Sequence, residues 1–268
     1  MRNLKKNIED YLDLLAENAL KLTKFGYYDI NFNVNFTKLS LADSILSKLS
    51  EGVNPIIGEI KPSSPSLGFK KNVDVKKIAK LMVKGGCAGI SVLVEPNYFK
   101  GHLMNIVRVK DNLRIPTLFK DIVVSPKQIE AASKLGADAI LLINQVFLRG
   151  YYPGTLEDAL DLAFKFNLEP LVEVHTLSEL KSILNLNVNL IGINSRNFKT
   201  LKTSLEKTAR ILRRIKRTEK IIVCESGIKN ADDIRKLKKS GGKAFLVGSS
   251  IMLSENVEKF VRELVYAC

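Results

Sequence analysis

Eight short apolar segments that alternate with amphipathic segments predict an α/β protein built as a (β/α)8 barrel. The apolar segments are rich in β-branched residues and leucine, as is typical of buried parallel strands. The predicted strands are residues 55–60, 88–94, 115–119, 138–143, 170–174, 189–193, 220–224 and 243–247. An open doubly wound sheet is the rival architecture, but no GxGxxG turn follows an early strand. The sequence therefore favours a closed barrel.

Two helical patterns precede the first predicted strand, near residues 4–23 and 39–50. In the first, Ile8, Leu12 and Leu15 recur at the spacing of one helical face. We expect one domain over residues 1–268, with a helical extension at 1–50 and the barrel core at 51–268.

Several of the later helices carry start signals. Ser125 precedes Pro126, which is favoured at the first helical position. Thr176 with Glu179, and Thr203 with Glu206, have the spacing of a capping box, in which hydroxyl and carboxylate satisfy backbone amides reciprocally. These signals predict helices that begin just after the corresponding strands.

The charge balance is the unusual feature of the composition. The chain of 268 residues has 42 Lys+Arg against 28 Asp+Glu, a net charge of +14, which points to an anionic partner. The lysine-rich segments at 76–77 and 235–239 lack interleaved aromatic residues, so we interpret them as solvent-exposed helix faces and expect no nucleic-acid partner. No apolar stretch is long enough for a membrane span, and the N-terminus has no signal-peptide pattern, so we expect no membrane partner.

The cysteines and histidines are few and scattered. Cys87, Cys224 and Cys268 form no CxxC pair, which favours a reducing compartment, the cytoplasm, and argues against a metal site. His175 directly follows the fifth predicted strand, and we interpret it as a structural histidine at the barrel rim. His102 is expected to be solvated.

Charged side chains end several of the predicted strands. In this barrel the carboxyl ends of the strands form the active-site face, and buried charges are costly unless they are paired. The residues at these ends are Glu59, Lys61, Glu95, Lys120, Asp121, Glu173, Asn194, Arg196 and Glu225. Two lysines and two carboxylates (Glu59, Lys61, Lys120 and Glu173) facing one cavity can carry out acid–base chemistry.

A phosphate site is indicated separately. Ser226 and Gly227 follow the seventh strand, and Gly248, Ser249 and Ser250 follow the eighth. These are the two loops that commonly bind phosphate in this barrel, assisted by a short helix.

These motifs together resemble the indole-3-glycerol phosphate synthase family, in the right order from about residue 40 to the C-terminus. The segments that carry the resemblance are residues 57–68 (IGEIKPSSPSLG), 91–101 (SVLVEPNYFKG), 120–121 (KD), 170–174 (PLVEV), 191–196 (IGINSR), 225–228 (ESGI) and 244–250 (AFLVGSS). The resemblance implies a carboxy-lyase of tryptophan biosynthesis. This enzyme closes the indole ring of 1-(2-carboxyphenylamino)-1-deoxyribulose 5-phosphate and releases carbon dioxide and water.

The resemblance also implies roles for the strand-end residues. Lys120 is the general acid at the ribulose carbonyl, Lys61 bridges to the substrate, and Glu59 orients Lys61. Glu173 is the base or cation stabiliser, and Asn194 and Ser226 hold the substrate. The remaining residues implied for substrate or phosphate binding are Glu225, Arg196, Ser64, Gly227, Gly248, Ser249 and Phe99. No metal or organic cofactor is implied. The implied partners are the phosphorylated substrate and other enzymes of the tryptophan pathway.

Dry walls for the anthranilate ring are expected from Phe99, Leu118, Ile122 and Leu142. The chain departs from the family pattern at Ile122, where Phe is usual, and at Pro62, where a basic residue is common. Further departures are Leu67, in place of Lys, and Asn197-Phe198, in place of Asp-Leu.

Two alternatives remain open at this stage. Another phosphate-binding barrel, such as phosphoribosylanthranilate isomerase, would be expected to carry Cys at the end of the first strand, where this chain has Glu-Ile-Lys. A basic nucleic-acid-binding or scaffold protein that retains the barrel is the non-enzymatic alternative.

Overall fold

The structure is a computed structural model that describes residues 8–64, 68–70, 73–111, 113–215 and 218–268. Within these residues eight parallel strands close a barrel, in which each strand pairs with its predecessor and the last pairs with the first. The strands are β1 (Ile56–Ile60), β4 (Gly89–Leu93), β5 (Thr117–Lys120), β6 (Ala139–Ile143), β7 (Glu169–Val174), β8 (Leu190–Asn194), β9 (Ile221–Glu225) and β10 (Ala244–Val247). The predicted barrel is confirmed, and every strand lies within two residues of its predicted bounds.

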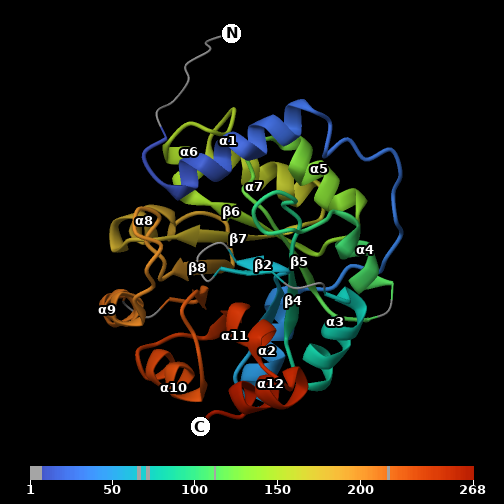
Figure 1. Ribbon diagram of the computed structural model, residues 1–268. Helices are drawn as coiled ribbons and strands as arrows, with labels where there is room; N and C mark the ends of the chain where they lie inside the picture. The colour runs from blue at the N-terminus through green and yellow to red at the C-terminus, as the bar shows by residue number, and fades with distance from the viewer. Residues whose placement is uncertain (1–7, 65–67, 71–72, 112, 216–217) are drawn as a thin grey trace.

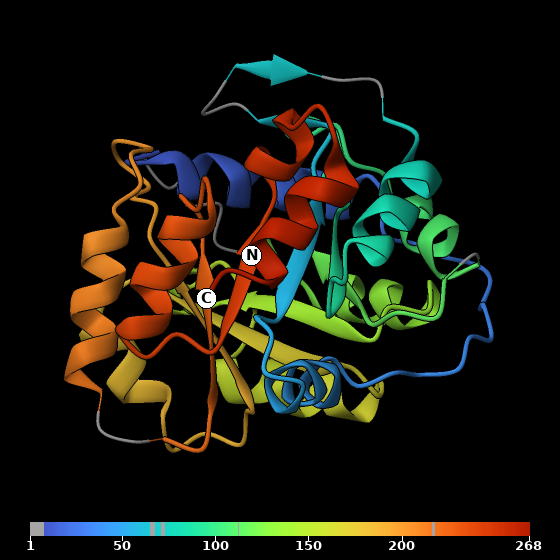
Figure 2. The same ribbon diagram turned by 90° about the horizontal axis from the view of Figure 1, so that it is seen from below.

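A small hairpin follows the first barrel strand. It consists of β2 (Ser63–Ser64) and β3 (Phe69–Lys70), which pair in antiparallel fashion. Figure 2 shows it standing out from the barrel. Sequence patterning did not predict these strands, because each is only two residues long.

Helices surround the barrel and lie between its strands in the chain (Figure 1). They are α3 (Val75–Lys84), α4 (Met104–Lys110), α5 (Pro126–Lys134), α6 (Asn144–Leu148), α7 (Leu156–Lys165), α8 (Leu177–Ile183), α9 (Leu205–Arg214), α10 (Ala231–Lys239), α11 (Ser249–Leu253) and α12 (Val257–Val265). Among the described residues, no helix combines the length and apolar character that a bilayer span requires.

Most of the predicted helix starts are confirmed. The Ser125 hydroxyl accepts from the amide of Lys127, and the Thr176 hydroxyl accepts from the amide of Glu179. The start predicted at Thr203 is wrong by one residue, because Ser204 caps α9 and accepts from the amide of Lys207.

The first predicted helix, residues 4–23, begins later than expected. In the described residues it is α1 (Tyr11–Lys24), and Asp10 caps it by accepting from the amides of Leu12 and Asp13. Arg149 binds the carboxylates of Asp10 and Asp13 at 2.8 Å each and ties this helix end to the segment after α6. The capping carboxylate therefore fixes where α1 begins.

The two N-terminal helices lie at opposite ends of the barrel (Figure 2). The second is α2 (Leu41–Ser50), and the amides of Leu41 and Ala42 donate to Glu169, the first residue of β7. In α1, Tyr11 and Leu15 line the cavity at the carboxyl ends of the strands. The extension thus covers the bottom of the barrel and forms part of its mouth.

A buried ion pair anchors the segment between these helices. Lys110 Nζ lies 2.7 Å from Asp138 Oδ2, and the two side chains are 2% and 0% exposed. Asp138 also accepts from the amides of Leu39, at 2.9 Å, and Thr117, at 2.8 Å. Removing one partner of such a pair leaves an uncompensated buried charge.

We predict that Lys110→Met lowers the free energy of unfolding by about 3–5 kcal/mol, because Asp138 is left buried without its cation. Urea denaturation at neutral pH measures the change. Lys127→Met is the matched control, since the pair of Lys127 and Asp29 is half exposed, and we expect it to cost less than about 1 kcal/mol. Equal losses in the two variants would contradict the anchoring role of Asp138.

Candidate active site

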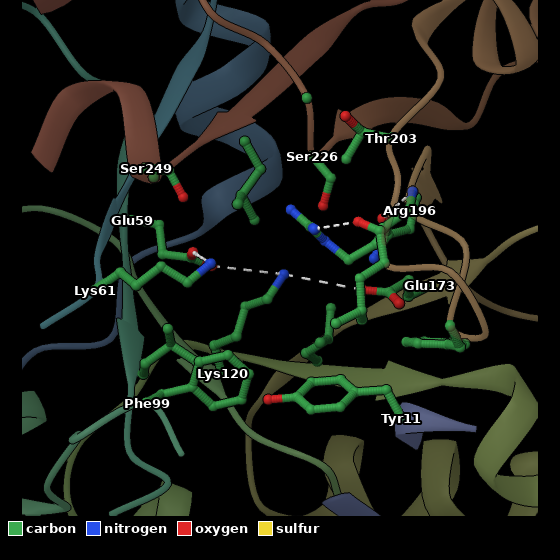
Figure 3. A pocket seen from close by; sticks show the side chains of 18 of the residues that line it. Tyr11, Glu59, Lys61, Phe99, Lys120, Glu173, Arg196, Thr203, Ser226 and Ser249 are labelled. Carbon is green, nitrogen blue, oxygen red and sulfur yellow. Dashed lines mark hydrogen bonds and ion pairs between the residues drawn. The ribbon is translucent and has the colours of Figure 1, made fainter. Parts of the chain in front are cut away.

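A cavity of about 560 Å³ opens at the carboxyl ends of the barrel strands (Figure 3). It is the end at which this barrel places its active sites. The predicted site residues that line it are Glu59, Lys61, Phe99, Lys120, Glu173, Asn194, Arg196, Ser226, Gly227, Gly248 and Ser249. Two predicted site residues are not part of this lining. Glu225 does not reach the cavity surface but forms an ion pair with Lys120. The side chain of Ser64 lies outside the described part of the structure, as does Leu67.

Four charged side chains form one layer of the barrel interior. Glu59, Lys120, Glu173 and Glu225 come from β1, β5, β7 and β9, which are alternate strands around the barrel. Side chains of alternate strands fill a (β/α)8 barrel in layers of four, and these layers are usually apolar. Here the layer at the mouth is ionic.

Lys120 lies at the centre of this layer. Its Nζ is 2.7 Å from Glu225 Oε2, 3.7 Å from Glu59 Oε2 and 3.9 Å from Glu173 Oε2. Burial disfavours the ammonium, but the three carboxylates outweigh burial and raise the pKa of Lys120 above its ordinary value. Lys120 is therefore a tightly held ammonium that stays protonated at neutral pH.

Glu59 links the two lysines of the site. Its Oε1 lies 3.0 Å from Lys61 Nζ, and the Lys61 ammonium lies 5.6 Å from the centre of the Phe99 ring. Burial would raise the pKa of Glu59, but Lys61 and Lys120 hold it below its ordinary value. The ion pair with Glu59 and the cation–π attraction of the Phe99 face hold the Lys61 ammonium in place.

Glu225 is the carboxylate closest to Lys120, and it is the one of the three whose pKa is raised. Burial, opposed by Lys120, raises the pKa of Glu225 to about 7. A Cβ on Gly192 of β8 would lie 2.0 Å from Glu225 Oε1, so the absence of a side chain at position 192 makes room for this carboxylate. The sequence predicts Glu225 at a strand end, but it does not show that the charge of this carboxylate changes with pH near neutrality.

Glu173 has a different set of partners. Its Oε1 lies 3.0 Å from His175 Nε2, and Oε2 faces Lys120. Burial would raise the pKa of Glu173, but the hydrogen bond from His175 and the charge of Lys120 lower it to about 2. Two of the three carboxylates around Lys120 are thus held ionised.

Glu95, also predicted at a strand end, is occupied by structural hydrogen bonds. It is fully buried, and it accepts from the amides of Asn97, Tyr98 and Phe99 and from the Asn18 side chain at 2.6–2.9 Å. The carboxylate therefore folds the loop that presents Phe99 and fastens that loop to α1.

Asp121, like Glu95, is occupied by structural hydrogen bonds. It accepts from the hydroxyl of Tyr28 at 2.6 Å, from the side chain of Gln128 at 3.0 Å and from the amide of Ile122 at 2.8 Å. Burial raises the pKa of Asp121 to about 7. These bonds join the segment after α1 to the loop that follows Lys120.

Small residues form the side of the cavity at the loops after β9 and β10. Ser226 and Gly227 both have positive φ, at 64° and 83°. A Cβ on Gly248 would lie 2.6 Å from Glu59 Oε1, so a side chain there would displace this carboxylate. Ser249 begins the short helix α11. Two of the four residues in the wall predicted to hold phosphate are thus glycines, and a side chain on Gly248 would not fit beside Glu59.

Arg196 is held by the loop after β8. Its guanidinium donates to the carbonyl of Leu201 at 2.7 Å, and its amide donates to Asn194 Oδ1 at 2.9 Å. Asn194, the last residue of β8, and Arg196 both line the cavity, so this end of β8 and its loop present an amide side chain and a cation to a ligand.

The apolar walls differ in part from those expected. Phe99 and Ile122 line the cavity, but Leu118 and Leu142 do not. Leu118 lies two residues below Lys120, deeper in the barrel. Leu142 is on the opposite face of β6 from the residues that do line the cavity, Leu141 and Ile143, because successive strand residues point to opposite sides.

Sequence reasoning missed two aromatic residues of the site. Tyr11 lines the cavity from α1, and burial raises its pKa to about 12. Phe198, noted only as a departure, also lines it, and its ring centre lies 4.4 Å from that of His175. The helical pattern of α1 indicated a buried face, but nothing in it showed that this face meets the barrel mouth.

Comparison with known proteins agrees with the motifs. Residues 12–264 match the family described as indole-3-glycerol phosphate synthase. An indole-3-glycerol phosphate synthase of Methanocaldococcus jannaschii is 42% identical over 85% of this chain and 84% of its own length. Another, from Caldanaerobacter subterraneus subsp. tengcongensis, is 36% identical over 96% of this chain and 98% of its own length.

Solved structures at low identity share the fold alone. A thiamine phosphate pyrophosphorylase from Pyrococcus furiosus superposes with a TM-score of 0.57 at 18% identity, over 84% of this chain and 96% of its own. An N-acetylmannosamine-6-phosphate 2-epimerase from Clostridium perfringens gives 0.58 at 14% identity, over 81% and 93%.

The family match covers nearly the whole chain, and curated relatives of similar length carry the same family name. The chain therefore belongs to the indole-3-glycerol phosphate synthase family.

Proposed function

We propose that the ionic layer at the barrel mouth closes the indole ring of 1-(2-carboxyphenylamino)-1-deoxyribulose 5-phosphate, with Lys120 as the central proton donor. The products are indole-3-glycerol phosphate, carbon dioxide and water. The observation that carries the proposal is the Lys120 ammonium, which lines the cavity and lies 2.7–3.9 Å from three buried carboxylates.

The first step is attack of the carboxylate-bearing ring carbon on the ribulose carbonyl. The carbonyl oxygen gains negative charge as the new carbon–carbon bond forms, and an ammonium beside it can donate a proton. A positioned side chain that is protonated at the operating pH can donate its proton as this charge forms. The raised pKa of Lys120 ensures that the side chain is the ammonium before the step begins.

The next steps restore the aromatic ring. The carbon–carboxylate bond breaks, carbon dioxide leaves, and its electron pair neutralises the iminium form of the ring. The hydroxyl formed in the first step then departs as water, with a proton that we assign to Lys61. Loss of a proton from the former methylene carbon to Glu173 completes the indole. Glu59 keeps Lys61 beside the substrate through their 3.0 Å contact.

Binding is divided between the two sides of the cavity. We assign the phosphate to the wall formed by Ser226, Gly227, Gly248 and Ser249. We assign the substrate hydroxyls and carboxylate to Asn194 and Arg196. The anthranilate ring fits the apolar side, where Tyr11, Phe99, Ile122, Leu141 and Phe198 exclude water. Exclusion of water strengthens each electrostatic contact during the reaction.

We infer the cytoplasm as the compartment, because Cys87, Cys224 and Cys268 are all free thiols. The substrate and product make the neighbouring enzymes of the tryptophan pathway its metabolic partners.

The function is tested by following indole fluorescence when the purified protein is given the carboxyphenylamino-deoxyribulose phosphate. We expect turnover by the native chain and a fall in kcat of about 10²–10⁴-fold for Lys120→Met, the range for loss of a general acid. Lys127→Met, an exposed lysine, is the matched control and should keep the native kcat. The proposal fails if the folded native chain does not turn over, or if Lys120→Met does.

The pH dependence of kcat tests the role assigned to Glu225. Because the pKa of Glu225 is raised to about 7, its carboxylate is lost as the pH falls below that value, and Lys120 loses its closest counter-ion. We expect kcat at saturating substrate to fall on the acid side of neutrality. In Glu225→Gln this limb should disappear, and kcat should stay near the low-pH value of the native enzyme. An unchanged limb in that variant would contradict the role.

A further inference from the structure

The ring of His175 stands between a catalytic carboxylate and a backbone carbonyl. Nε2 lies 3.0 Å from Glu173 Oε1, and Nδ1 lies 3.1 Å from the carbonyl oxygen of Arg196. The residue is only 6% exposed, and the ring packs against Phe198. None of the roles proposed above uses this histidine.

These contacts determine where the protons of the ring lie. A carbonyl oxygen can only accept, so Nδ1 carries a proton. An ionised carboxylate also only accepts, so the contact with Oε1 needs a second proton, on Nε2 or on Glu173 itself. Without it, two lone pairs would face each other at 3.0 Å in a buried site.

The surroundings decide which atom holds the second proton. The groups facing His175 are Glu173 of β7, Glu179 of α8, whose Oε2 accepts from the His175 amide at 3.2 Å, and the Arg196 carbonyl. All three favour a cation on the ring. Glu173 Oε2 in turn faces the Lys120 ammonium at 3.9 Å, which favours the ionised carboxylate. The arrangement therefore places the proton on His175.

We propose that His175 is a positioning residue, present as an imidazolium, which holds Glu173 Oε1 and leaves Oε2 as the atom that accepts the substrate proton. This rests on the base role proposed for Glu173. In that step a carbon–hydrogen bond of the substrate breaks, its electron pair forms the ring double bond, and the proton goes to Oε2. The proton on Nε2 stays in place throughout, and Glu173 later releases the substrate proton to water.

The protonation state can be measured directly, because the chain has two histidines, His102 and His175. In protein labelled with ¹⁵N-histidine, the exposed His102 provides the reference signals, assigned with His102→Gln. We expect both nitrogens of His175 to be protonated at about pH 7.5, one unit above the ordinary histidine pKa. Glu173→Gln should convert His175 to a neutral ring at that pH. A neutral ring in the native protein would overturn the proposal.

Kinetics of two amide variants separate positioning from simple packing. In His175→Gln the side-chain amide can reach the place of Nε2 and donate to Glu173, whereas in His175→Asn it reaches only the place of Nδ1, beside the Arg196 carbonyl. We expect kcat to fall by less than about tenfold in His175→Gln and by about 100-fold in His175→Asn, the range for loss of a hydrogen bond to a charged group. KM should change by less than about threefold in both, because the phosphate wall is untouched.

Equal kcat values for the two variants, whether both native or both reduced, would overturn the positioning role. The two proposals fail separately. Absence of turnover by the native chain would remove the proposed function and leave the imidazolium measurable, whereas a neutral His175 in an active enzyme would remove only the inference about His175.

Discussion

The site depends on a single ammonium group that three buried carboxylates surround. Neither the lysine nor the carboxylates would be stable alone at this depth, because an unpaired buried charge is costly. When Glu225 is ionised, the three carboxylates balance the charges of Lys120, Lys61 and the proposed imidazolium of His175. Each carboxylate has its own neighbours, so the three differ in pKa although all touch the same cation. The different neighbours of Glu59, Glu173 and Glu225 therefore give three carboxylates of one layer different acidities.

The barrel makes this layer possible. Strands β1, β5, β7 and β9 are far apart in the chain, and only closure of the sheet brings their ends to one point. Below the mouth, apolar side chains such as Leu118 and Leu171 fill the interior and are fully buried. The N-terminal extension completes the enclosure from both ends. Through Glu95, α1 also fixes the loop that carries Phe99, so the extension contributes to the geometry of the site.

The strand-end residues of the site were predictable, because strand patterning and the face rule of this barrel depend on local sequence alone. Lys120, Glu173 and Glu59 were placed at the mouth in this way, and they do meet there. Contributions from outside the strands were not predictable. Tyr11 reaches the cavity through the docking of α1, and no local pattern encodes that docking. His175 was interpreted as a structural histidine, since its position after a strand does not reveal that its ring turns back to Glu173. Leu142 does not line the cavity, because it points to the face of β6 opposite Leu141 and Ile143, and strand alternation alone excludes it.

The net charge of +14 is only partly explained by the site. Among the described residues, the cations that line the cavity are Lys61, Lys120, Arg196, Lys202 and Lys229. The central claim concerns Lys120, and the most direct measurement is its own titration, by NMR of protein labelled with ¹³C at the lysine Cε. The Lys120 signal can be assigned with Lys120→Arg. The account predicts an ammonium that stays protonated beyond about pH 10.4, the ordinary lysine value. A titration midpoint below that value would contradict it, because the three carboxylates would then not hold the proton that the reaction uses.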